Sequence, residues 1–190
     1  IDSTDIPAIV GFVKVIASAT LSLKLNTELI STFEGRYYDA TIANSGPVPP
    51  VVGQETSYTF RLMVGNTSND IKDARVSIIL PTGVRYTGRG NLSNDRFIYN
   101  ERANELVWDI GVLAAETRRD IVFQLAVIPD ISAVSTMMPL VTRAVVTGKD
   151  TFTGKEFRIE HKEKNTNLPE DTALPVGAAR VQPEGTTPGL

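Results

Sequence analysis

Few residues in this sequence are of the types that carry out catalysis. The 190 residues include one histidine, His161, and no cysteine. Disulfides, iron–sulfur clusters and thiolate zinc sites are therefore excluded. A Ser-His-Asp triad would have to use His161, and the sequence singles out neither a nucleophile nor a third group for it. We interpret His161, at the end of EFRIEH, as a solvated residue at a strand end.

Other motifs of enzyme chemistry are also missing. The sequence has no phosphate loop, dinucleotide fingerprint, zinc pattern or nucleophile elbow. We therefore expect neither an enzyme nor a cofactor.

Carboxylates raise the question of calcium. The alternating acids of an EF-hand loop are absent. Acids from separate loops can still converge at one end of a fold, and the candidates are Asp39 and Asp150. Asp150 lies in GKDTFTG, where a hairpin would place backbone carbonyls nearby. Acids on a protein surface usually just face water. A calcium site at Asp39 or Asp150 is kept as the alternative to that interpretation.

Two sequence patterns match glycosylation acceptors. Asn66 begins the triplet NTS, and Asn91 begins NLS. Both triplets fall in stretches that we predict to be turns, which favours access by a modifying enzyme.

The charge balance narrows the range of partners. The net charge is -3, and no basic run is longer than Arg118-Arg119. Neither nucleic acid nor an anionic membrane surface is an expected partner. Residues 6–23 are apolar, but Lys14 interrupts them and acids precede them. We interpret this stretch as a buried strand rather than a targeting segment.

Hydrophobic residues alternate along most of the chain. In SYTFRLMV, Tyr58, Phe60, Leu62 and Val64 share one face, the mark of a half-buried strand. DARVSIIL, ELVWDIG and DIVFQLAVIP repeat the pattern, and turn residues separate them. We predict an all-β, immunoglobulin-like β-sandwich of about seven strands, with additional N-terminal strands. Trp108, the only tryptophan, should lie in its core.

The chain is expected to fall into three parts. Residues 47–164 form the sandwich, and residues 165–190, with four prolines, form a linker or tail. Residues 1–46 carry further strands, including one at 36–43, RYYDATIA. They belong either to this sandwich or to the back half of a preceding unit. Pro47, Pro49 and Pro50 should keep the connection extended and outside any central ladder.

Several stretches together resemble a known family. They cover residues 52–127 and read VGQETSYTF, GNTSNDIKDARVSIILPTGVRYTG, ELVWDIGVLAAET and DIVFQLAV. The sequence resembles the tandem immunoglobulin-like repeat of unknown function, number eleven in the common domain catalogue, of bacterial and archaeal surface proteins. Departures are Ile79 for an acidic residue and Ala115-Glu116 for a glycine. The resemblance implies a structural or adhesive role at the cell surface or in the cell envelope, and carries over no catalytic residue.

The sequence thus supports two functions of different kinds. The first is a non-catalytic module of a larger extracellular protein, serving as a spacer, assembly or adhesion unit. Its partners would be neighbouring modules or copies, or a glycan or protein on another surface. The alternative is a carbohydrate-binding module that stacks sugars on exposed aromatics such as Tyr37, Tyr38 or Tyr86.

Overall fold

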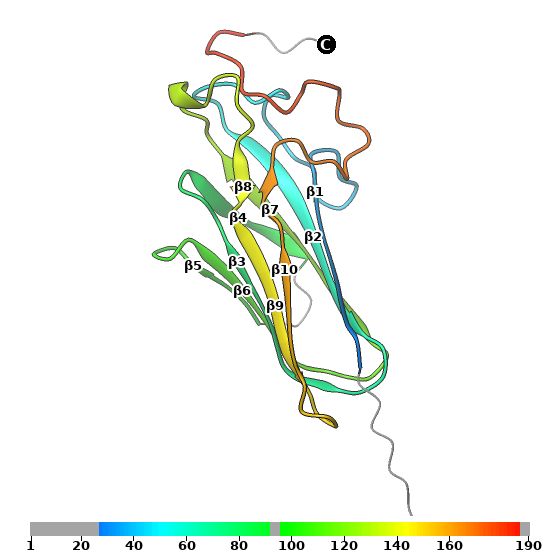
Figure 1. Cartoon of the computed structure of the whole chain (residues 1–190). Coiled ribbons are helices and arrows are strands. Elements are labelled where there is room, and N and C mark those ends of the chain that lie inside the picture. The colour runs from blue at the N-terminus through cyan, green and yellow to red at the C-terminus, as the bar shows by residue number, and fades with distance from the viewer. Residues whose placement is uncertain (1–26, 92–95, 187–190) are drawn as a thin grey trace, which may run out of the picture.

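Two antiparallel β-sheets face each other in the computed structural model, which describes residues 27–91 and 96–186 (Figure 1). The four-stranded sheet has the order β1 (Leu29–Arg36), β2 (Thr56–Asn66), β7 (Arg118–Val127) and β4 (Val84–Asn91). The five-stranded sheet has the order β10 (Glu156–His161), β9 (Arg143–Asp150), β3 (Ile71–Ile79), β6 (Glu105–Leu113) and β5 (Arg96–Asn100). A small sheet pairs β8 (Pro139–Val141) with β11 (Lys164–Asn165), and a 3-10 helix, η1, spans Ile131–Ala133. The prediction of an all-β, immunoglobulin-like sandwich is confirmed.

The core lies between the inner faces of the two sheets. Successive side chains of a strand point to opposite faces, so alternate residues of β2 and β7 enter the core. The residues predicted to do so are at most 1% exposed: Tyr58, Phe60, Leu62, Val64, Ile121, Phe123, Leu125 and Val127. Trp108 on β6 is fully buried, as predicted.

A row of phenylalanines crosses this core. Ring centroids are 5.5 Å apart from Phe33 to Phe60, 5.8 Å from Phe60 to Phe123 and 5.7 Å from Phe123 to Phe97. The row joins β1, β2, β7 and β5. Because Phe33 is only 5% exposed, β1 contributes to the same core as the other strands.

The N-terminal strand lies earlier in the chain than predicted. The prediction of a strand at 36–43 is wrong, because β1 ends at Arg36 and turns follow. Asp39 accepts hydrogen bonds from the N–H groups of Thr41 and Ile42, and these local bonds replace a strand ladder. β1 pairs with β2 along its whole length, from Leu29 opposite Asn66 to Arg36 opposite Thr59. Residues 1–26 lie outside the described residues.

The loop after β1 covers the outer face of β2. The Thr59 hydroxyl donates to the carbonyl of Ile42 at 3.2 Å, and the Gln124 amide donates to that of Ala43 at 3.2 Å. Thr59 and Gln124 are buried for this reason, although the alternation in the sequence indicated that Thr59 faces solvent.

The C-terminal segment differs from the predicted linker. Within residues 165–186, five residues are at most 5% exposed, namely Thr166, Leu168, Ala178, Ala179 and Val181. The few apolar residues of this segment are buried because they pack on other parts of the chain. Leu168 belongs to the core of the sandwich, and Val181 packs with Val52 and with Ala133 of η1.

The proline-rich connection pairs with this C-terminal segment. The carbonyl of Pro50 accepts a hydrogen bond of 2.7 Å from the N–H of Gln182, and the N–H of Val52 donates to Gln182 at 3.0 Å. Val51 thereby forms a parallel bridge with Gln182. The connection joins neither large sheet, in keeping with the missing N–H groups of its prolines.

Candidate functional site

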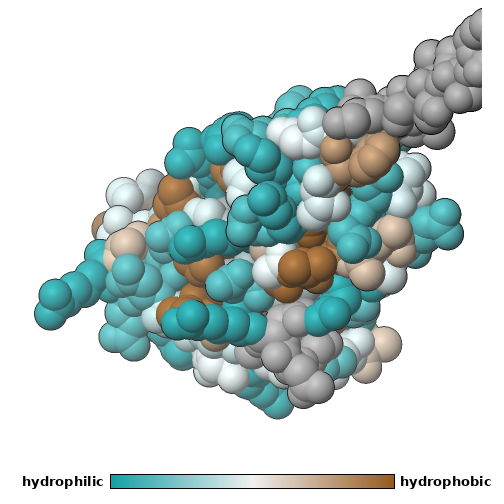
Figure 2. Space-filling view, turned by 90° about the horizontal axis from the view of Figure 1, so that it is seen from below, coloured by the Kyte–Doolittle hydropathy of each residue, from teal (hydrophilic) through white to brown (hydrophobic). Residues whose placement is uncertain are grey.

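The described chain enters the sandwich at one pole and leaves it at the other. In Figure 1 the start of β1 lies at the lower end, and the residues near 186 lie at the upper end. Viewed from below, hydrophilic residues cover most of the lower pole, and hydrophobic ones lie singly or in small groups (Figure 2). A neighbouring unit at this pole would therefore meet a mainly polar surface rather than a large apolar patch.

Asp150 fixes the entry of the chain at the lower pole. Its Oδ2 atom accepts hydrogen bonds from the Thr27 N–H at 3.1 Å and the Asn69 side-chain amide at 2.9 Å. Its Oδ1 atom accepts from the N–H groups of Phe152 and Thr153 at 2.8 and 2.9 Å. Burial acts to raise the pKa of this carboxyl, but the four hydrogen bonds outweigh it and hold the pKa far below its usual range.

Asp39 is engaged in a comparable way after β1. The guanidinium of Arg61 forms a two-pronged contact with its carboxylate, at 2.7 and 2.9 Å. Burial acts to raise the pKa of Asp39, but the Arg61 contact and the N–H groups of Thr41 and Ile42 lower it.

The two calcium candidates are not brought together. Asp150 contacts Thr27, two residues before β1, and Asp39 follows the end of β1, so the length of this strand separates the two acids. In the part of the chain that the structure describes, no cluster of three or more His, Cys, Asp or Glu residues could hold a metal ion.

A seam joins β1 to the C-terminal segment along the open side of the sandwich. We define it as residues 31–38 with residues 161–171. The Ser31 hydroxyl and His161 Nε2 lie 2.9 Å apart. Leu168 lies against Gly35, where an added Cβ would be 2.7 Å from its Cδ2 atom.

The seam closes with a buried carboxylate. Asp171 is 6% exposed, and its Oδ2 atom accepts hydrogen bonds from the N–H groups of Tyr37 at 2.7 Å and Tyr38 at 2.8 Å. Lys164 pairs with Glu170 beside it and also lies over the Phe33 ring, 5.9 Å from its centroid. Residues 161–171 therefore contact β1 directly, in addition to the contacts that β1 makes with β2.

His161 is half-buried in this seam rather than solvated as predicted. Its ring lies 5.8 Å from that of Phe33. Burial lowers the pKa of His161, and the nearby charge of Lys164 lowers it further. Among the described residues Ser31 is the only hydrogen-bond partner of the imidazole ring, so the pair lacks the orienting third group of a triad.

The two glycosylation candidates have different surroundings. Asn66 is buried, and its side-chain amide donates to the carbonyl of Asn69 at 2.6 Å. A glycan on this nitrogen would replace that bond, so the surroundings of Asn66 do not favour the modification, which stays a prediction. Asn91 is exposed at the end of β4, and the next residues of its triplet lie outside the described residues.

The tyrosines proposed for sugar binding are not equally accessible. Tyr38 is 48% exposed and packs edge-on to Tyr37, with the ring centroids 5.0 Å apart. The Tyr37 hydroxyl donates to the carbonyl of Gly46 at 2.7 Å. Tyr86 packs edge-on against Phe97 and Tyr99. Of the three, only Tyr38 is exposed, while Tyr37 and Tyr86 are half-buried.

The sequence signals for these arrangements are weak. Nothing around Asp171 distinguishes it from the other acids of a polar segment, and its partners are more than 130 positions away in the sequence. Only the small residue Gly35, in the middle of an alternating stretch, indicates a close approach of another segment.

Comparisons with known proteins return distant structural similarities only. No protein-family model matches the sequence, and no curated protein matches it significantly. The major pilin BcpA of Bacillus cereus has 11% identity and a TM-score of 0.47, covering 80% of this chain and 44% of BcpA. The RrgA Jo.In complex has 8% identity and a TM-score of 0.46, covering 70% of this chain and 79% of that one.

A third similar structure is the full-length major pilin SpaD of Corynebacterium diphtheriae. It has 15% identity and a TM-score of 0.44, covering 74% of this chain and 34% of SpaD. The chain therefore spans less than half of either pilin subunit. The overlaps are partial, and the fold class follows from the sheets described above. The resemblance to the tandem repeat family stays a prediction.

No helix among the described residues is long and apolar enough to cross a membrane.

Proposed function

We propose that this chain is a non-catalytic structural module of a larger cell-surface protein. It serves as a spacer or assembly unit within a string of modules. The observation that supports this most strongly is the position of the described ends at opposite poles of the sandwich (Figure 1). A module with this geometry adds its own length to the chain that contains it.

The anchoring of both ends supports the same proposal. Asp150 accepts a hydrogen bond from Thr27, two residues before β1, and Gln182 forms backbone hydrogen bonds with Pro50 and Val52. The seam then connects β1 directly to the segment that leads out of the module. Tension applied at the ends would meet ordered hydrogen bonds rather than a loose linker.

Solution scattering of repeated chains tests the spacer role. Chains that contain one, two and three copies of residues 1–190 in series are compared by small-angle X-ray scattering. We expect the maximum dimension to grow by an equal step with each copy. A second copy that adds little to this dimension would show that the modules fold back on one another, and would contradict the spacer role.

A second candidate function, sugar binding through exposed aromatics, has one favourable observation, the exposed ring of Tyr38. One ring forms a small stacking platform, so we place this function second. A glycan array with the wild type and Tyr38→Ala tests it. A defined sugar that binds the wild type and not the variant would support the alternative.

A further inference from the structure

The outer face of the five-stranded sheet carries side chains in ordered rows. Strand pairing places one residue of each strand opposite its neighbour, so the rows run across the strands. The first row, in the order β10, β9, β3, β6, β5, contains Arg158, Thr147, Arg75, Asp109 and Arg96. We call its three arginines the arginine row. The next row contains Glu160, Val145, Ser77, Val107 and Ile98.

The arginine row has a regular spacing. Its members lie on every second strand, and neighbouring strands are about 4.8 Å apart, so the backbone positions recur about every 10 Å. This repeat is close to the length of two pyranose rings joined by a glycosidic bond. A linear polysaccharide laid across the strands could therefore present one acidic group to each arginine.

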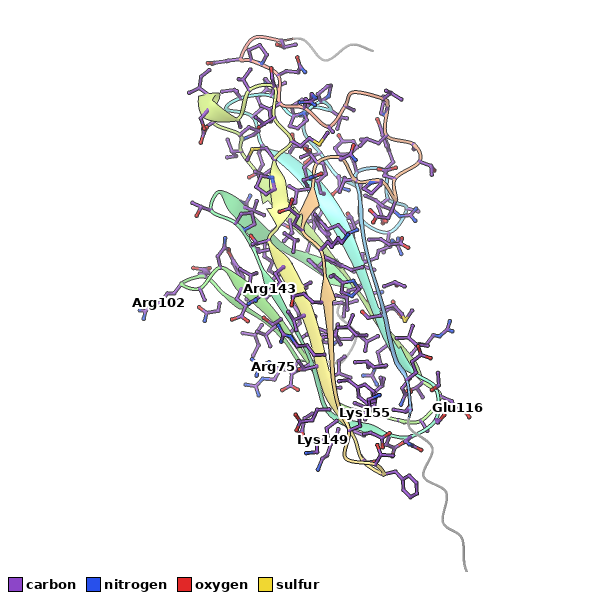
Figure 3. The ribbon with its side chains drawn as sticks, viewed as in Figure 1. Arg75, Arg102, Glu116, Arg143, Lys149 and Lys155 are labelled. Carbon is purple, nitrogen blue, oxygen red and sulfur yellow. The ribbon has the colours of Figure 1, made fainter. Side chains whose placement is uncertain are left out.

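A fourth arginine strengthens the site. Arg143 on β9 lies opposite Ile79, on the far side of the second row. A shallow groove is lined by Arg75, Arg143, Arg158, Ser77, Thr147, Val145 and Glu105. Figure 3 shows Arg75 and Arg143 on the same side of the five-stranded sheet.

Most of these arginines have no ion-pair partner among the residues that the structure describes. Arg75, Arg96 and Arg143 form no ion pair with any residue in 27–91 or 96–186. Arg158 pairs with Glu160 at 3.2 Å, in an exposed contact of small energy.

Carboxylates share this face with the four arginines and Lys149. Glu160 pairs with Arg158, Glu156 pairs with Lys149, Glu105 accepts a hydrogen bond from Ser77, and Asp109 lies between Arg75 and Arg96 in the row. Over these residues the cations outnumber the carboxylates by one, on a chain whose net charge is -3.

The row beside the arginines is largely aliphatic. Val107 is half-buried and Ile98 is 42% exposed. The C–H faces of sugar rings pack on such a strip, while guanidinium groups bind carboxylates through paired N–H donors. From this juxtaposition we propose that the outer face of the five-stranded sheet binds an acidic polysaccharide with about one carboxylate per disaccharide.

The charge repeat distinguishes this ligand from an acidic protein. In an extended acidic peptide, side chains on one face recur about every 7 Å, since the rise is about 3.3 Å per residue. Such a peptide has a higher charge density and a repeat that does not match the arginine row. Unspecific attraction would favour the denser polymer, whereas recognition by spacing favours the polysaccharide.

Calorimetric titration with a hyaluronan octasaccharide, which carries one carboxylate per disaccharide, tests the proposal. We expect binding that weakens as salt is added. The triple variant Arg75→Gln, Arg96→Gln and Arg158→Gln, which removes the arginine row, should bind about tenfold more weakly, as expected for the loss of three exposed charge pairs. The matched control, Arg85→Gln, Arg89→Gln and Arg118→Gln, removes the same charge from the other sheet and should bind like the wild type.

Three results would overturn the proposal. One is the absence of octasaccharide binding at low salt. Another is an equal loss of affinity in both triple variants, which would indicate attraction by overall charge alone. The third is tighter binding of poly-L-glutamate of matched length, which would indicate an acidic protein as the partner. None of these results depends on the spacer role.

Discussion

The carboxylate of Asp171 accepts a hydrogen bond of 2.7 Å from the backbone N–H of Tyr37, 134 positions earlier in the chain. This contact marks the place where the first described strand ends and where the C-terminal segment is fastened to it. The sandwich is thereby closed along the side between β1 and β10.

Asp171→Ala should destabilise the fold by about 2–3 kcal/mol. The substitution removes a buried carboxylate and leaves the part-buried N–H groups of Tyr37 and Tyr38 without their charged acceptor. Urea denaturation measures the change. Glu163→Ala, an exposed acid in the same segment, should stay within about 0.5 kcal/mol of the wild type. Equal stability of the two variants would show that the seam contributes nothing.

The contact of Gly35 with Leu168 gives a second prediction. Gly35→Ala should cost about 1–3 kcal/mol, because the new Cβ would lie 2.7 Å from Leu168 Cδ2 and 2.9 Å from Phe60 Cε1. Leu168→Ala makes room for it. The double variant should therefore lose less stability than the sum of the single losses. If the loss of stability in the double variant equals the sum of the two single losses, Leu168 of the C-terminal segment does not pack on Gly35 of β1.

The His161 ring should make stability depend on pH. Because its pKa is lowered in the fold, the unfolded chain takes up a proton more readily than the folded one. The stabilisation that comes from the neutral His161 ring is therefore fully present above the pKa of the unfolded chain, about 6.5. It is lost as the pH falls through the lower pKa of the folded protein. Between pH 7.5 and pH 5.5 the wild type should lose more stability than His161→Gln in urea denaturation. Parallel losses would place the ring in solvent.

Removal of the N-terminal region should expose a strand. A chain that begins at Val51 lacks β1 and the loop over Thr59, so β2 becomes an edge of its sheet. We expect lost stability and concentration-dependent aggregation through that edge, measured by light scattering. A monomeric chain of unchanged stability would instead assign residues 29–46 to a separate unit.

Local patterns predicted the strands that form the centre of the sandwich. The alternation of Tyr58, Phe60, Leu62 and Val64 is sufficient because side-chain direction in a strand depends only on the local backbone. Residues 37–43 are equally rich in strand-forming types, yet they turn because Asp39 binds nearby N–H groups and Asp171 binds those of Tyr37 and Tyr38. The second of these causes is not visible in local sequence.

The candidate site was less predictable for the same reason. Asp150 was singled out as a calcium candidate, and calcium binding there stays a prediction. Its carboxylate instead accepts hydrogen bonds from Thr27 and Asn69, which are distant in sequence and which no local pattern indicates. Asn66 matched a surface pattern although it is buried. The arginine row depends on the pairing of separate strands, which no single stretch encodes.

Force spectroscopy on single molecules tests the central claim, that tension passes from β1 through the seam to the C-terminal segment. The sequence has no cysteine, so Glu28→Cys and Glu184→Cys, at two exposed positions, supply unique attachment points. A force applied at these two points would act on the eight residue pairs between β1 and β2 and on the contacts of the seam at the same time. Forced unfolding depends on the unfolding rate, so Asp171→Ala should lower the unfolding force, while Glu163→Ala should not. Equal unfolding forces in the wild type and Asp171→Ala would contradict the claim.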